Sequence, residues 1–77
     1  MKITDIVITH AQRTPIGKYS GALAPLNAVQ LGTHAVSAVL RKSAIDPRLV
    51  GQVIMGHGRQ AGNGPNTARQ EAIRAGL

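Results

Sequence analysis

The sequence contains no cysteine, tryptophan or phenylalanine, and Tyr19 is its single aromatic residue. Without cysteine, the chain can form neither a disulfide nor a thiolate metal site, on which many small domains depend. Bulky core residues are also scarce, because 11 alanines contribute a large part of the 43% apolar content. A chain of 77 residues with neither cross-links nor large core side chains is expected to need further protein around it in order to fold.

Acidic residues are few as well, with three against nine basic residues and a formal net charge of +6. Such a balance can indicate nucleic-acid binding. The basic residues are scattered, however, and Arg41 and Lys42 are the only adjacent pair. Apart from the single Tyr19, no aromatic residue lies among them to stack on bases. We interpret the charge as solvated surface and expect no nucleic-acid partner. A free-standing basic α/β module that binds nucleic acid or a phosphorylated ligand stays open as the alternative.

Long hydrophobic runs are missing too. Near the N-terminus, no more than three apolar residues follow one another, at Ile6, Val7 and Ile8. This run is too short for the hydrophobic part of a signal peptide or for a membrane span. We therefore expect a cytoplasmic protein that does not interact with membranes.

The apolar runs that are present predict strands. Residues 3–9 contain a continuous β-branched stretch, which is typical of a strand buried on both faces. Residues 52–55 predict a second strand of the same kind, and residues 56–65, with four glycines and a proline, predict an irregular loop. A helix between the two strands would give a right-handed β-α-β unit with parallel strands.

Two helices are predicted from their end signals. The first should begin at Asn27, a good N-cap residue, with Gln30 completing a capping box. Gly32 inside this helix costs up to about 1 kcal/mol relative to alanine, so we expect close packing against another backbone at that position. The second helix should begin at Asn66 and end at Gly76, a favourable residue after a helix C-terminus. The expected fold is an incomplete α/β layer of order β-α-β-α.

No catalytic or metal-binding group emerges from local motifs. Residues 56–61 match the pattern G-x-G-x-x-A after a predicted strand, but Gly62 and Pro65 delay the helix that a dinucleotide site requires, so we interpret a turn-rich loop. The three histidines are widely spaced and form no local ligand pair. We interpret His57, which follows the second predicted strand, as structural.

Short motifs nevertheless follow one another in a recognisable order along the whole chain. They are Ala11-Gln12-Arg13-Thr14-Pro15-Ile16-Gly17, Gln30-Leu31-Gly32, Asp46-Pro47, Val53-Ile54-Met55-Gly56, Gln60-Ala61-Gly62, Asn66-Thr67-Ala68-Arg69-Gln70 and Ala75-Gly76-Leu77. In order and spacing they resemble the N-terminal part of the thiolase family, the acetyl-coenzyme A acetyltransferases. Two departures stand out, since Gly58 and Arg59 replace two aliphatic residues and Thr67 replaces a common proline.

The resemblance implies a fold of two similar α/β halves, each with a mixed sheet layered with helices. Residues 1–77 would be a partial N-terminal domain, truncated before the catalytic cysteine. It implies Claisen condensation or thiolytic cleavage of 3-oxoacyl-coenzyme A, in which a cysteine takes the acyl group, a histidine activates it and a second cysteine moves a proton. None of these residues can be assigned here, so this chain alone is expected to be inactive.

The resemblance also guides the remaining expectations. We assign no catalytic, cofactor-binding or metal-binding residue, and propose Arg13, Gln60, Asn66 and Arg69 as residues that order the loops around the site. No cofactor is expected on this segment, and coenzyme A thioesters are substrates of the family. The acyl-coenzyme A substrate would be bound by the rest of the enzyme, which when complete would be a homodimer or homotetramer.

Overall fold

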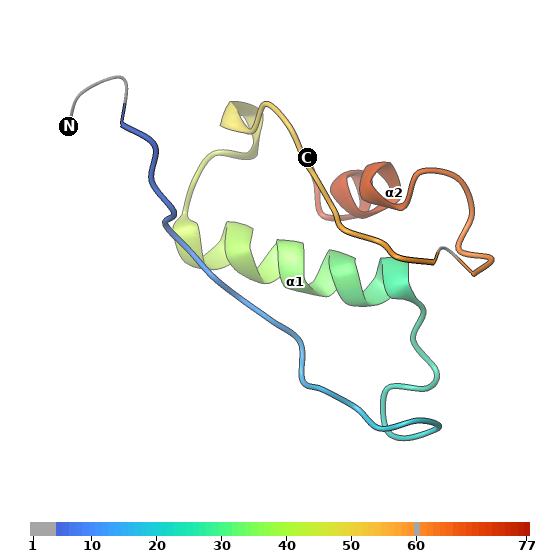
Figure 1. The fold of residues 1–77 in the computed structure, drawn as a ribbon. Coiled ribbons are helices and arrows are strands. Elements are labelled where there is room, and N and C mark those ends of the chain that lie inside the picture. The colour runs from blue at the N-terminus through green and yellow to red at the C-terminus, as the bar shows by residue number, and fades with distance from the viewer. Residues whose placement is uncertain (1–4, 60) are drawn as a thin grey trace.

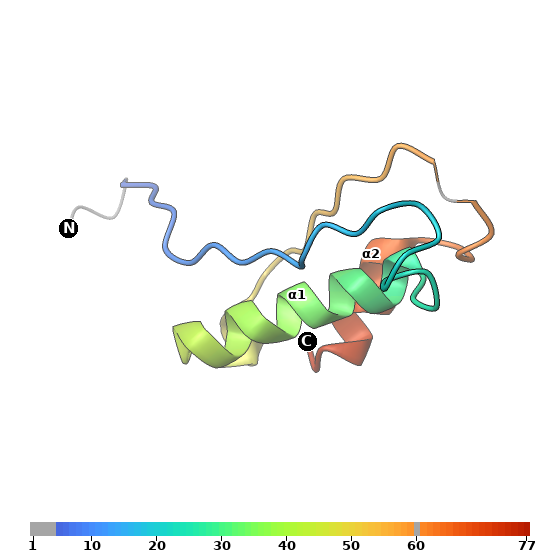
Figure 2. The same ribbon diagram turned by 90° about the horizontal axis from the view of Figure 1, so that it is seen from below.

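The computed structural model describes residues 5–59 and 61–77. Its elements, in chain order, are helix α1 (Ala28–Ser43), the short 3-10 helix η1 (Pro47–Leu49) and helix α2 (Thr67–Arg74). Figure 1 shows α2 beside α1, with extended chain before α1 and between η1 and α2. The view from below in Figure 2 confirms that the two helices lie against each other.

Helix α1 begins where the sequence predicts. The Gln30 amide donates to Asn27 Oδ1 at 2.8 Å, and the Asn27 amide donates to Gln30 Oε1 at 2.9 Å. These reciprocal bonds form the predicted capping box and satisfy two amides that the first turn of a helix leaves without partners. Ala44, with a φ of 55°, closes the helix in the left-handed conformation. The two basic residues of the last turn lie at the negative end of the helix dipole, as predicted.

Helix α2 also has the predicted ends. Asn66 is its N-cap, and the Asn66 Oδ1 accepts a hydrogen bond from the Arg69 amide at 3.1 Å. Gly76 follows the last turn with a φ of 93°, a conformation that glycine adopts without the clash a Cβ would cause. The predicted turn at Asp46 is likewise present as η1, where hydrogen bonds from Arg48 hold the pKa of the Asp46 carboxyl below its ordinary value.

The predicted strands are not formed in this structure. Residues 5–9 and 52–55 have no regular secondary structure, and no strand occurs in the described ranges 5–59 and 61–77; residues 3 and 4 of the first predicted strand lie outside them. A strand needs a neighbour at about 4.8 Å with which to exchange backbone hydrogen bonds. Among the described residues neither segment has such a neighbour, and Ile6 and Ile54 are 97% and 80% exposed. The β-branched residues are present, but the sheet that would bury them is not.

The described residues enclose very little core. Val29 is the one buried apolar side chain among them. The accessible surface is 6436 Å², whereas a folded monomer of this mass would expose about 4,500 Å². The radius of gyration is 14.2 Å, against about 11.5 Å for a compact domain of this length. The chain thus adopts an open arrangement in which much apolar surface has no cover. No described helix combines the length and apolar character needed to cross a bilayer.

Candidate functional site

Side-chain hydrogen bonds concentrate where the loop before α2 meets the start of that helix. His57 Nδ1 lies 3.0 Å from Thr67 Oγ1, and Thr67 is buried. Further along α2, Gln70 Nε2 donates to the carbonyl oxygens of Asn63 at 2.9 Å and Pro65 at 3.0 Å. Two side chains of α2 therefore hold the loop from both ends, which fixes the path of the chain into the helix.

Thr67 is one of the two departures from the thiolase pattern, and the structure shows what it contributes. It occupies the first position of α2, where proline is favoured because its φ is already set for a helix. A proline has no side-chain hydroxyl, so it could not bond to His57. The contact agrees with the interpretation of His57 as a structural residue. Threonine at this position gives up the favourable backbone φ of proline and gains a side-chain hydrogen bond.

Glu71 lies at the contact between the two helices. Its side chain is buried, and a Cβ added to Gly32 of α1 would collide with its carboxylate. Close packing at Gly32 is therefore confirmed, but the neighbour is the Glu71 side chain and not the backbone that was predicted. Glu71 Oε2 has no hydrogen-bond partner within the described residues. A desolvated carboxylate oxygen without a donor is unfavourable.

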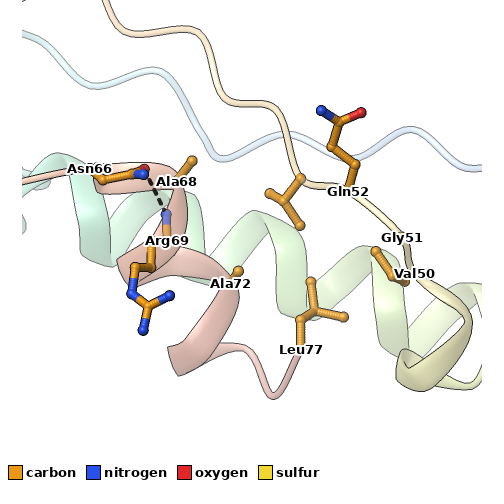
Figure 3. Close-up of a pocket in the computed structure, with 9 residues that line it drawn as sticks. Val50, Gly51, Gln52, Asn66, Ala68, Arg69, Ala72 and Leu77 are labelled. Carbon is orange, nitrogen blue, oxygen red and sulfur yellow. Dashed lines mark hydrogen bonds between the residues drawn. The ribbon is translucent and has the colours of Figure 1, made fainter.

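Two of the four residues proposed from the sequence come together. Asn66 and Arg69 meet through the N-cap hydrogen bond, and both line an open hollow between α2 and residues 50–53. Figure 3 shows Leu77 on the wall of this hollow and the Arg69 guanidinium directed away from Gln52.

The other two proposed residues do not join them. Arg13 is exposed in the extended segment before α1 and makes no hydrogen bond or ion pair with the described part of the chain. Gln60 lies outside the described residues. Within residues 5–59 and 61–77, no three histidine, aspartate or glutamate side chains are grouped as metal ligands would be. The Thr67 hydroxyl lies beside the His57 ring, as a nucleophile lies beside its base, but Thr67 is buried. Among the described residues this pair therefore offers a positioning contact at the start of α2.

Comparison with known proteins identifies the family. The model of the thiolase N-terminal domain matches residues 6–77. The chain is 47% identical to acetyl-CoA acetyltransferase of Cupriavidus necator over 75 residues, which cover 97% of this chain and 19% of the relative. It is 47% identical to a probable acetyl-CoA acetyltransferase of Escherichia coli (95% and 19% covered) and 42% identical to a probable acetyl-CoA acyltransferase of Staphylococcus epidermidis (97% and 19% covered).

No solved structure matches the chain. The chain spans about a fifth of the length of the curated relatives that it matches. Because the family model extends over nearly all of the sequence and the relatives align across more than nine tenths of it, the chain belongs to the thiolase family, through the N-terminal domain.

Proposed function

We propose that residues 1–77 are the N-terminal scaffold of an acetyl-coenzyme A acetyltransferase and carry none of its catalytic groups. The observation that supports this most is the identity of 47% to an acetyl-CoA acetyltransferase across 97% of the chain but only 19% of the relative. In the proposed reaction, a cysteine thiolate takes an acyl group from 3-oxoacyl-coenzyme A or from acetyl-coenzyme A. This sequence has no cysteine, so that step belongs to residues outside it.

The open structure supports a scaffold role. About 2,000 Å² more surface is exposed than a compact chain of this mass would show, and exposed isoleucines at positions 6 and 54 contribute to it. In a larger domain, further strands and helices would cover this apolar surface. We propose that residues 3–9 and 52–55 become strands of a mixed sheet once those neighbours are present.

The proposal extends to the complete enzyme. Its substrates would be acyl-coenzyme A thioesters, bound by residues outside this segment, and no separate cofactor is needed for the thiolate chemistry. A homodimer or homotetramer in the cytoplasm is the proposed form. The contacts at the start of α2 would give the scaffold a fixed geometry, since the loop, Thr67 and Gln70 hold one another.

A chimeric enzyme, called the fused protein below, tests this function. In it, residues 1–77 replace the matching segment of the Cupriavidus necator acetyltransferase. The rate of thiolytic cleavage of acetoacetyl-coenzyme A is compared between the fused protein and the parent enzyme. We expect the fusion to fold and to turn over, because the scaffold supplies packing and the parent supplies the chemistry. A folded fusion without activity would overturn the proposal.

The same fused protein tests the contact between α1 and α2. Glu71→Ala removes a carboxylate whose Oε2 atom has no hydrogen-bond partner within the described residues, so it is expected to raise the free energy of unfolding by about 1–3 kcal/mol. In the Glu71→Ala protein, Gly32→Ala should raise the free energy of unfolding further, by as much as about 1 kcal/mol, because alanine has a higher helix propensity than glycine. In the parent background this gain is offset, because the new Cβ and the carboxylate compete for one space. Denaturant unfolding of the parent, the two single variants and the double variant gives the coupling free energy between positions 32 and 71. Equal effects of Gly32→Ala with and without Glu71 would disprove the contact.

The link between the loop and α2 gives a further prediction. Thr67→Val keeps the shape of the side chain but leaves the His57 ring without its partner, so the fused protein should lose about 1 kcal/mol of stability. In a His57→Ala background the same substitution should have little effect, because the bond is already absent. Thermal unfolding provides the measurement, and an undiminished loss in that background would show that Thr67 acts through another contact.

A further inference from the structure

The loop before α2 contains an Asn63-Gly64 pair in an unusual backbone conformation. Gly64 has a φ of 85°, the left-handed region that glycine enters without strain, and it is exposed. With no Cβ on Gly64, nothing on that residue hinders the approach of the Asn63 side chain to the nitrogen of the next peptide unit. Within the described residues, the Gly64 amide donates no hydrogen bond to another backbone group. This nitrogen is therefore available to react.

We propose that Asn63 is a site of spontaneous deamidation. The deprotonated Gly64 amide nitrogen attacks the Cγ atom of Asn63, a new C–N bond forms, and the side-chain amide nitrogen leaves as ammonia. Water then opens the resulting succinimide ring at one of its two carbonyl carbons, which yields aspartate or isoaspartate at position 63. Water is the only co-reactant, and no atom changes its oxidation state.

Gln70 is placed to promote the attack. Its Nε2 atom donates to the Asn63 carbonyl oxygen at 2.9 Å. That oxygen and the Gly64 nitrogen belong to the same peptide unit, so negative charge left on the nitrogen by loss of its proton is shared with the oxygen. A hydrogen bond to the charged form stabilises it. The second bond from Nε2, to the Pro65 carbonyl at 3.0 Å, holds the donor in position.

Positive charge surrounds the same place. Asn63 lines a hollow together with Arg69 and Arg74 of α2. Two guanidinium groups favour the anionic intermediate and the carboxylate product, although exposure to solvent weakens the effect. Deamidation would lower the net charge of the chain from +6 to +5. Isoaspartate would also insert an extra backbone atom and move the carbonyl away from Gln70, which loosens the loop at the start of α2.

The other two asparagines provide internal controls. Asn27 and Asn66 are the N-cap residues of α1 and α2. They are followed by Ala28 and Thr67, whose Cβ atoms hinder the attack. All three asparagines lie in one chain, so their rates can be compared within a single sample.

Peptide mapping by mass spectrometry tests the proposal on the fused protein, which carries residues 1–77 in a complete enzyme, incubated at mildly alkaline pH. We expect the peptide with Asn63 to gain about one dalton, as aspartate and isoaspartate, well before those with Asn27 or Asn66. Gln70→Leu should slow this gain roughly fivefold, the equivalent of one hydrogen bond, while Gln52→Leu should not.

Two further arms complete the test. Gly64→Ala should suppress the reaction at Asn63, because a Cβ then blocks the nitrogen, and concentrated urea should abolish the difference between the Gln70→Leu and parent chains. Equal rates at the three asparagines would overturn the site. An unchanged rate in Gln70→Leu under native conditions would overturn the role of Gln70.

Discussion

The 77-residue chain alone is expected to leave acetoacetyl-coenzyme A uncleaved in the presence of coenzyme A. The proposed reaction begins with a cysteine thiolate, and the sequence contains no cysteine. Other nucleophiles would need a base held beside them. The histidine fixed by a side-chain contact, His57, faces the Thr67 hydroxyl, which is buried beneath the loop and out of reach of a substrate. Loss of the acetoacetyl-coenzyme A absorbance measures the reaction.

The Cupriavidus necator acetyltransferase under identical conditions is the positive control, and a mock purification from the same host measures contaminating thiolase. We expect the control to cleave acetoacetyl-coenzyme A at its full enzymatic rate and the 77-residue chain to show no cleavage above the mock sample. Turnover that copurifies with the chain and exceeds the mock sample would contradict the proposal that the chemistry lies outside these residues.

The second large effect concerns folding. We expect the isolated chain to unfold without a cooperative transition, because ordering costs about 1.5 kcal/mol per residue and Val29 is the one buried apolar side chain among the described residues. Far-ultraviolet circular dichroism in increasing denaturant should show a gradual loss of helix signal. Tyr19 is 99% exposed, so near-ultraviolet signals would report little. A sharp transition with a linear dependence of the free energy on denaturant would show an independent domain and revive the free-standing module as the function.

The helix ends could be predicted because their chemistry is local. Asn27 and Gln30 satisfy each other within three residues, and Asn66 caps α2 in the same way. The left-handed Gly76 is a further local feature. Each of these signals needs only the residue itself and its near neighbours, so it survives even in a chain with very little core.

The strands could not be predicted in this way, because a sheet depends on partners far away in the sequence. The β-branched residues near Ile6 and Ile54 indicate segments that suit a buried sheet, but they cannot supply the adjacent strand. The contact between α1 and α2 could be predicted in part. Gly32 signalled that something packs closely, whereas the identity of that neighbour, Glu71, required the structure.

The candidate site shows the same division. The contact of Asn66 with Arg69 spans three residues and follows from N-cap chemistry. The contact of His57 with Thr67 spans ten residues, and its only sequence signal was the replacement of a common family proline by threonine. Asn63 and Gln70, seven residues apart, gave no signal before the loop was seen.

The central claim is that this chain is the scaffold of a larger enzyme. Amide NMR spectra of the isotope-labelled chain test it most directly, recorded for the chain alone and after addition of the remaining part of a related enzyme. The added protein is the Cupriavidus necator acetyltransferase without the segment that residues 1–77 match. We predict poorly dispersed signals for the chain alone and dispersed signals after the addition, because the two β-branched segments then gain neighbours with which to form a sheet. A well-dispersed spectrum of the isolated monomer that the added protein leaves unchanged would contradict the claim that this chain is the scaffold of a larger enzyme.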